Sequence, residues 1–141
     1  NEQLLTKLLT QQWGFDGLVV SDWTAIEELR LHGVAANSKE AALLAIKAGV
    51  DVDMVSGDYL NELPVLLKEG RITEDLINRA ARRVLKAKYD LGLFADPYKY
   101  HDIQREQTDI LTTKNLQLAR DAARKSIVLL KNSQQPLRTA D

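Results

Sequence analysis

The sequence predicts an α/β fold, because short apolar runs alternate with helix-like segments over its first two thirds. Leu18–Val20 and Val50–Val55 are rich in β-branched residues, and each run follows a glycine. Runs of this kind are typical of buried strands in a parallel sheet. Two parallel strands cannot cover the several helices around them. We therefore interpret the chain as part of a larger sheet or barrel, in preference to a very small α/β domain.

Caps and apolar spacing predict the helices on either side of the first strand. Asn1 is a suitable N-cap for a first helix that ends at Trp13-Gly14. Residues 26–31 can form a short helical turn that His32-Gly33 breaks. Ser38 then caps a helix that runs to Gly49. The apolar faces of the two longer helices consist of Leu4, Leu5, Leu8 and Leu9, and of Ala41, Ala42, Ala45 and Ala48.

Two helices are predicted after the second strand. The first starts near Pro64, because proline is tolerated in a first turn, and ends at Gly70. Thr73 caps the second helix, and Leu91–Phe94 closes it. The apolar stripe of the second helix consists of Ile77, Ala80, Ala81, Val84 and Leu85.

The chain changes character after Ala95. Residues 96–112 contain a turn-forming Asp-Pro pair and no apolar period, which predicts an extended linker on the surface. A helix capped by Thr112 or Thr113 follows, with Leu116, Ala119 and Ala123 facing inward. Ile127–Leu130 predicts a third buried strand, before a turn at Lys131-Asn132.

The composition narrows the class of protein. The 141 residues carry 19 basic and 20 acidic side chains, so the net charge of −1 gives no case for nucleic-acid binding. Hydrophobic residues make up 45%, as in a globular protein, and no run is long enough to suggest a membrane span. The absence of cysteine excludes disulfides and thiolate metal sites within these 141 residues and leaves the compartment open.

Asp22 is the strongest candidate for chemistry, because it follows directly on the first apolar run. In parallel sheets, ligands bind beyond the carboxyl ends of the strands, where Asp22 is expected to lie. An aspartate at a strand end can also serve only to cap the next turn.

Several segments of the chain together resemble glycoside hydrolase family 3, the β-glucosidase and β-xylosidase family. The stretch Trp13–Trp23, with Gly-Phe-Asp-Gly-Leu-Val-Val-Ser-Asp-Trp at its centre, resembles the family's nucleophile strand. Asn1 with Leu4-Leu5 resembles the start of the helix before it. Further matches follow in the family's order: Ala48–Met54 with the next barrel strand, Ile72–Phe94 with the last barrel helix, and Ala123–Asn132 with the entry to the second domain.

This resemblance implies a fold, a reaction and a domain plan. Residues 1–95 would be the C-terminal portion of a TIM-like barrel, 96–112 an interdomain linker and 113–141 the start of an α/β-sandwich domain. Asp22 would be the nucleophile of a retaining, exo-acting β-glycosidase that removes terminal β-D-glucosyl residues. The acid/base glutamate and most sugar ligands of the family would lie outside these 141 residues, so the chain alone is expected to be inactive. No cofactor is expected.

Other residues carry weaker hypotheses. Trp23 could stack on a sugar ring and Met54 could line the same pocket, although both could equally be core side chains. Asp51 and Asp53 could bind a metal, but one pair is a weak signal, and the resemblance makes them structural. His32 and His101 lack partners at zinc-ligand spacing, and neither forms a convincing triad with Ser21. The basic side formed by Arg82, Arg83, Lys86 and Lys88 is expected to be solvated or to form interdomain ion pairs.

The expected partners follow from the resemblance and from the incomplete sheet. They are a β-glucoside or related oligosaccharide and the remainder of a parent chain, with no nucleic acid or membrane. Exposed barrel edges favour a homo-oligomer. The resemblance favours a periplasmic or secreted protein. The alternative is a small α/β or helical interaction or oligomerisation domain without catalytic activity.

Overall fold

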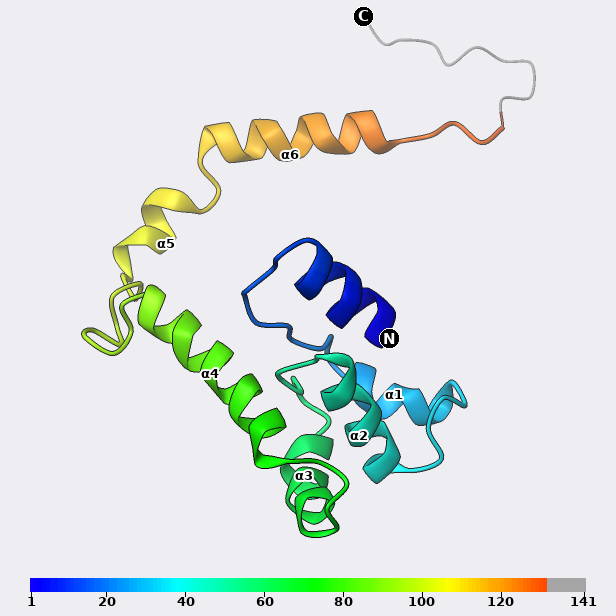
Figure 1. Cartoon of the computed structure of the whole chain (residues 1–141). Helices are drawn as coiled ribbons and strands as arrows, with labels where there is room; N and C mark the ends of the chain where they lie inside the picture. Colours follow the sequence, from blue (N-terminus) through cyan, green and yellow to red (C-terminus); the bar gives the residue numbers. More distant parts are fainter. Residues whose placement is uncertain (132–141) are drawn as a thin grey trace, which may run out of the picture. The chain divides into compact units, whose positions relative to one another are not determined.

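The computed structural model describes residues 1–131, which fall into two compact units (Figure 1). The first unit is Asn1–Pro97, and the second begins at Tyr98. The first unit contains η1 (Gln3–Gln12), α1 (Ala25–Leu31), α2 (Ser38–Ala48), α3 (Asp58–Lys68) and α4 (Glu74–Asp90). The second contains α5 (Gln104–Asp109) and α6 (Thr113–Ser126). Every helix within residues 1–131 is too short or too polar to cross a lipid bilayer.

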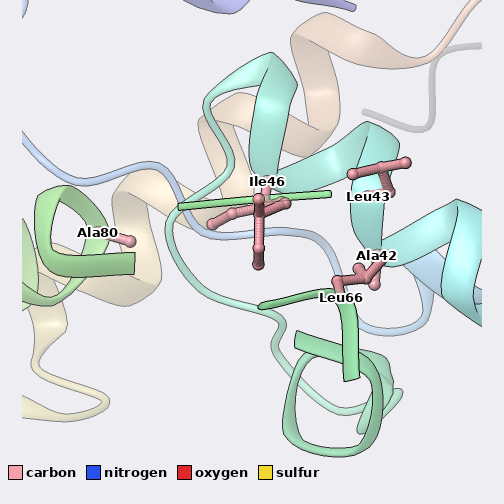
Figure 2. Close-up of a cluster of buried hydrophobic side chains, with 6 residues drawn as sticks. Ala42, Leu43, Ile46, Leu66 and Ala80 are labelled. Carbon is pink, nitrogen blue, oxygen red and sulfur yellow. The ribbon is translucent and has the colours of Figure 1, made fainter. Parts of the chain in front are cut away.

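Helix α2 forms the centre of the first unit, where it packs against α1, α3 and η1. The side chains of Ala42, Leu43 and Ile46 on α2 meet Leu66 of α3 and Ala80 of α4 in one buried cluster (Figure 2). On another face of α2, two buried alanines pack with Ile26 and Ala35. The small side chains of α2 therefore allow close packing on several sides, as its alanine-rich sequence predicts.

Several helix boundaries agree with the sequence. The Asn1 side chain accepts a hydrogen bond from the Leu4 N–H at 3.3 Å, and the first helix ends at Trp13. This helix is wound as a π-helix, with the Trp13 N–H donating to the Leu8 carbonyl, and none of its residues is buried. Gly49 ends α2 with φ of 103°, a conformation that favours glycine.

Two helix starts differ from the predictions. The cap of α2 is Asn37 and not Ser38, because the Asn37 side chain accepts the Glu40 N–H at 3.0 Å. Helix α3 starts at Asp58, so Pro64 lies in its interior and not in its first turn. The prediction from proline alone was wrong because the helix begins six residues earlier, where the Asp53 carboxylate accepts the N–H of Tyr59 in its first turn.

The sequence predicted strands at 18–20, 50–55 and 127–130. This prediction is wrong, because none of these segments forms an extended strand within residues 1–131. A single parallel bridge joins Val20 to Val52, and helices make up the rest of the regular structure described. Val20 is exposed, and not buried as predicted, because the described residues provide no third strand or helix to cover this side of the bridge. The result is a helical structure around one parallel bridge, which fits part of an α/β domain.

The second unit also differs from the prediction. The region expected to be an extended linker contains the short helix α5. Thr112 caps α6 by accepting the Asn115 N–H at 3.2 Å, as predicted, but Leu116, Ala119 and Ala123 are exposed. Ile127–Leu130 is also exposed and forms no strand, because a strand requires a neighbouring strand and none is present among residues 98–131. Asn132, in the predicted turn, lies outside the described residues.

Candidate active site

The candidate site is built on two backbone segments that run side by side, residues 19–21 and 51–54. The Val52 N–H donates to the Val19 carbonyl at 3.2 Å, and the Ser21 N–H donates to the Val52 carbonyl at 2.9 Å. This alternation is the hydrogen-bond pattern of a parallel pair. The Asp51 N–H also donates to the Val19 carbonyl at 2.8 Å. These bonds fix the register of the chain immediately before Asp22.

The Asp51 carboxylate takes the place of a backbone acceptor at the start of this paired segment. If the parallel ladder continued toward its start, the Val19 N–H would donate to the Val50 carbonyl. That carbonyl instead accepts the Tyr59 hydroxyl at 2.8 Å. The Val19 N–H donates to Asp51 Oδ2 at 2.9 Å. Burial, with the Asp53 and Asp51 carboxylates nearby, raises the pKa of Tyr59, so its hydroxyl remains a donor.

The Asp51 carboxylate is paired with Arg83 of α4. The side chain of Asp51 is 0% exposed and that of Arg83 is 16% exposed, and Arg83 Nη1 lies 3.2 Å from Asp51 Oδ2. The sequence predicted that Arg83 would be solvated or would form an interdomain ion pair. Both predictions are wrong for Arg83, which pairs with Asp51 inside the first unit. The spacing of charges along α4 does not show which arginine turns inward. Helical spacing could have indicated it, since Arg83 follows the buried Ala80 by three residues and therefore shares its face of the helix.

Asp22, Trp23 and Met54 lie at the carboxyl ends of the paired segments. The Ser21 hydroxyl connects the two ends by donating to the Asp22 carbonyl at 2.8 Å and accepting the Met54 N–H at 3.0 Å. The Asp22 carboxylate accepts the Trp23 N–H at 2.7 Å, and not an N–H of α1. All three side chains are exposed among the described residues. The structure thus brings an exposed carboxylate, an aromatic face and a thioether to one edge.

The neighbouring aspartate, Asp53, has a local structural role. Its carboxylate accepts hydrogen bonds from the N–H and hydroxyl of Ser56 and from the N–H of Tyr59, in the first turn of α3. These bonds satisfy a helix donor that has no partner within the helix. Within residues 1–131, no three histidine, cysteine, aspartate or glutamate side chains are grouped to hold a metal ion.

The histidines are used in surface contacts among the described residues. His32 Nε2 lies 3.8 Å from Glu28 at the end of α1. His101 makes an edge-to-face contact with Tyr98. Neither contact involves Ser21, whose hydroxyl is bonded to backbone groups of Asp22 and Met54.

An apolar hollow of about 490 Å³ lies beside these segments. It is bordered by Asn1 and Glu2 just before η1, by α1 and α2, and by Ser21, Val34 and Val50. Asp22, Trp23 and Met54 do not line it. Ser21 lines the hollow and is bonded to Asp22 and Met54, so the hollow adjoins the exposed edge although the candidate side chains do not line it.

Comparison with known sequences identifies the family. The model of the glycosyl hydrolase family 3 N-terminal domain matches residues 1–87. The chain belongs to glycoside hydrolase family 3. Its curated family 3 relatives include β-glucosidases and β-xylosidases, which are hydrolases.

Two relatives illustrate the similarity in sequence. The chain is 45% identical over 133 residues to the periplasmic β-glucosidase of Salmonella typhimurium, covering 92% of this chain and 17% of the relative. It is 41% identical over 133 residues to a putative β-xylosidase of Formosa agariphila, covering 94% and 17%. The chain spans less than a fifth of the length of these relatives.

A solved family 3 structure has a similar fold over this region. The β-glucosidase of Listeria innocua matches with a TM-score of 0.78 and 41% identity, over 99% of this chain and 19% of that protein. Structures of the Listeria enzyme in complex with laminaribiose, in a mutant form, and with glucose also match.

Proposed function

We propose that this chain is the nucleophile-bearing part of a retaining β-glycosidase, with Asp22 as the nucleophile. One observation carries the proposal. Asp22 is an exposed carboxylate at the carboxyl end of a paired backbone segment, in a chain that belongs to family 3. Its backbone is held in register through Val19 and Ser21, while its carboxylate remains accessible.

The proposed reaction is a double displacement. The Asp22 carboxylate attacks the anomeric carbon as the bond to the leaving oxygen breaks, and an acid group protonates that oxygen. Water, deprotonated by the same group, then cleaves the glycosyl ester and restores Asp22. We place the acid/base group outside this chain, where the family resemblance puts a glutamate.

The proposed substrate is a terminal β-D-glucosyl residue or a related sugar. The names of the relatives include both glucosidase and xylosidase, and the Listeria structures contain laminaribiose or glucose. Trp23, exposed beside Asp22, would stack on the apolar face of the sugar ring. Met54, linked to Ser21 through its N–H, would line the same site.

The proposal includes a domain plan and a location. Residues 1–95 would complete a TIM-like barrel with the remainder of a longer chain, 96–112 would link the domains, and 113–141 would begin the second domain. A periplasmic or secreted location is proposed from the Salmonella relative, which is named as periplasmic.

The test uses a chimera in which this chain replaces the matching segment of the Salmonella β-glucosidase. We expect the chimera to hydrolyse an aryl β-glucoside, and Asp22→Gly to lower its kcat by at least about 10³-fold, because the nucleophile is lost. Azide should restore turnover and give the α-glucosyl azide, since it attacks in a single displacement from the face that Asp22 occupied.

Asp16→Gly is the matched control, because Asp16 is also an exposed aspartate close to the paired segment. It should leave kcat within about threefold, the range expected of a surface substitution. Near-normal hydrolysis by Asp22→Gly, or a folded Asp22→Gly variant that azide cannot rescue, would contradict the proposal.

A further inference from the structure

We propose that Asp51 is a positioning residue for the nucleophile, held in place by Arg83. The inference rests on the proposed role of Asp22 and adds a residue that does not touch the substrate. Asp51 would act through the backbone of Val19, three residues before Asp22.

The first step of the argument is the hydrogen bond from Val19 to Asp51. The Val19 N–H donates to the Asp51 carboxylate, while the Val50 carbonyl accepts the Tyr59 hydroxyl. Asp51 thus contacts the segment from both its backbone and its side chain, with its own N–H donating to the Val19 carbonyl. Loss of the carboxylate would leave the Val19 N–H without this acceptor, and only the bonds to the Val19 carbonyl would hold this end of residues 19–21.

The second step is charge. A buried carboxylate is tolerated only when it is paired and hydrogen-bonded, and Asp51 has both Arg83 and the Val19 N–H. A buried ion pair often stabilises a fold no more than apolar side chains of similar size would. An orienting role is consistent with a pair that adds little net stability. Arg83 brings its charge from α4, so the helix and the paired segments are fixed to each other.

The third step connects the segment to the reacting group. The Ser21 N–H is bonded to Val52 and the Ser21 hydroxyl to the Asp22 carbonyl, so the backbone is restrained up to Asp22. The carboxylate of Asp22 accepts the N–H of its own neighbour, Trp23. The position of this carboxylate is therefore determined by the backbone, and a displacement of about 1 Å can lower a rate by about 10²-fold.

The experiment compares two chimeras that differ in one acceptor. Asp51→Val with Arg83→Met removes both charges and the acceptor for Val19. Asp51→Asn with Arg83→Met removes both charges but keeps an amide oxygen as acceptor. We expect the valine variant to lose about 10-fold to 10²-fold in kcat with KM changed less than about threefold, and the asparagine variant to keep kcat within about threefold.

Arg82→Met is the control for α4, because Arg82 is exposed and adjacent to Arg83. Its kcat should equal that of the parent chimera. If the valine variant fails to fold, Asp51→Glu replaces it. This variant keeps the charge but shifts the acceptor by one methylene, and it should also lower kcat with little change in KM.

A second background separates positioning from general damage. In the Asp22→Gly chimera with azide, no carboxylate remains to be positioned. Asp51→Val with Arg83→Met, or Asp51→Glu where it replaces that variant, should lower kcat in the chimera that keeps Asp22. In the Asp22→Gly chimera the same substitution should slow the azide reaction by less than about threefold. An equal loss in both backgrounds would overturn the inference. A normal kcat in the valine variant, or in the glutamate variant where it replaces the valine variant, would also overturn it. An active Asp22→Gly chimera without azide would instead overturn the proposed function.

Discussion

The three aspartates at positions 51, 53 and 58 lie within eight residues of one another, yet their environments differ. Asp51 is buried against an arginine, and Asp53 is half-buried and caps the first turn of α3. Asp58 begins α3 and is buried, and its Oδ2 has no hydrogen-bond partner. Residue type alone could not distinguish them. From the sequence, Asp51 and Asp53 could be considered only as a possible metal pair. The partners of Asp51, Val19 and Arg83, lie 32 residues before and after it, and local sequence does not reveal such contacts.

Asp58 provides a pH-dependent prediction. Burial raises the pKa of Asp58 above its ordinary range, although the nearby Arg30 opposes this effect. The folded state therefore binds more protons than the unfolded state between the ordinary and the raised pKa, and stability falls as pH rises through that window. We expect Asp58→Asn to stabilise the chain at neutral pH and to have little effect below the ordinary pKa.

Urea unfolding of the parent chimera and of the chimera with Asp58→Asn, at several pH values, would measure this difference. Asp75→Asn, at an exposed position in the first turn of α4, is the matched control. A stability difference that stayed constant from acid to neutral pH would contradict the assignment of the effect to Asp58 ionisation.

At the scale of elements, helices with both a cap and an apolar face could be predicted from the sequence. Helix α2 is the best case, since its alanine face and Gly49 were correctly interpreted and its cap differed by one residue. The paired segments were not predictable as they stand. Apolar runs indicate the capacity to form strands, but strand length depends on neighbours that supply hydrogen bonds and cover side chains. Asp22 could be named as a candidate because it follows an apolar run directly, whereas its role as nucleophile was an expectation from the family resemblance.

Helix α3 gives a prediction at this scale. Pro64 lies in its interior, where proline supplies no N–H and crowds the carbonyl four residues earlier. Pro64 is exposed, so a smaller side chain there leaves no buried cavity. We expect Pro64→Ala to slow amide hydrogen exchange of residues 65–68 by about tenfold, equivalent to about 1.4 kcal/mol. Unchanged exchange would contradict the expected cost of the proline, and faster exchange would show that the proline stabilises this helix.

At the scale of the whole molecule, each unit exposes apolar surface. The first unit has the apolar hollow beside α1 and α2, and the second exposes Leu116, Leu118 and Ile127–Leu130. Exposed apolar patches are typical of surfaces that contact other protein. Family 3 relatives are more than five times as long as the matched region, which accords with a proposal that further chain covers these surfaces.

The isolated chain should therefore be inactive on aryl β-glucosides and should associate or bind a hydrophobic dye. Loss of a general acid or base typically lowers a rate by about 10² to 10⁴-fold, and the lost sugar contacts lower it further. Sedimentation, dye fluorescence and a glycosidase assay would test this expectation. Robust turnover would contradict it, and a monodisperse, cooperatively folding monomer with low dye binding would favour the interaction-domain alternative.

The bridge between Val20 and Val52 allows no change of chain length just before Asp22. Successive side chains of a paired segment face opposite sides, so one residue inserted or deleted between Gly17 and Asp22 would turn Asp22 to the other side. Residues 32–34, between α1 and α2, are exposed. Helix α2 has its own N-cap at Asn37, so its start does not depend on the length of this turn. Insertions and deletions should therefore be tolerated in that turn and eliminated by selection at the bridge.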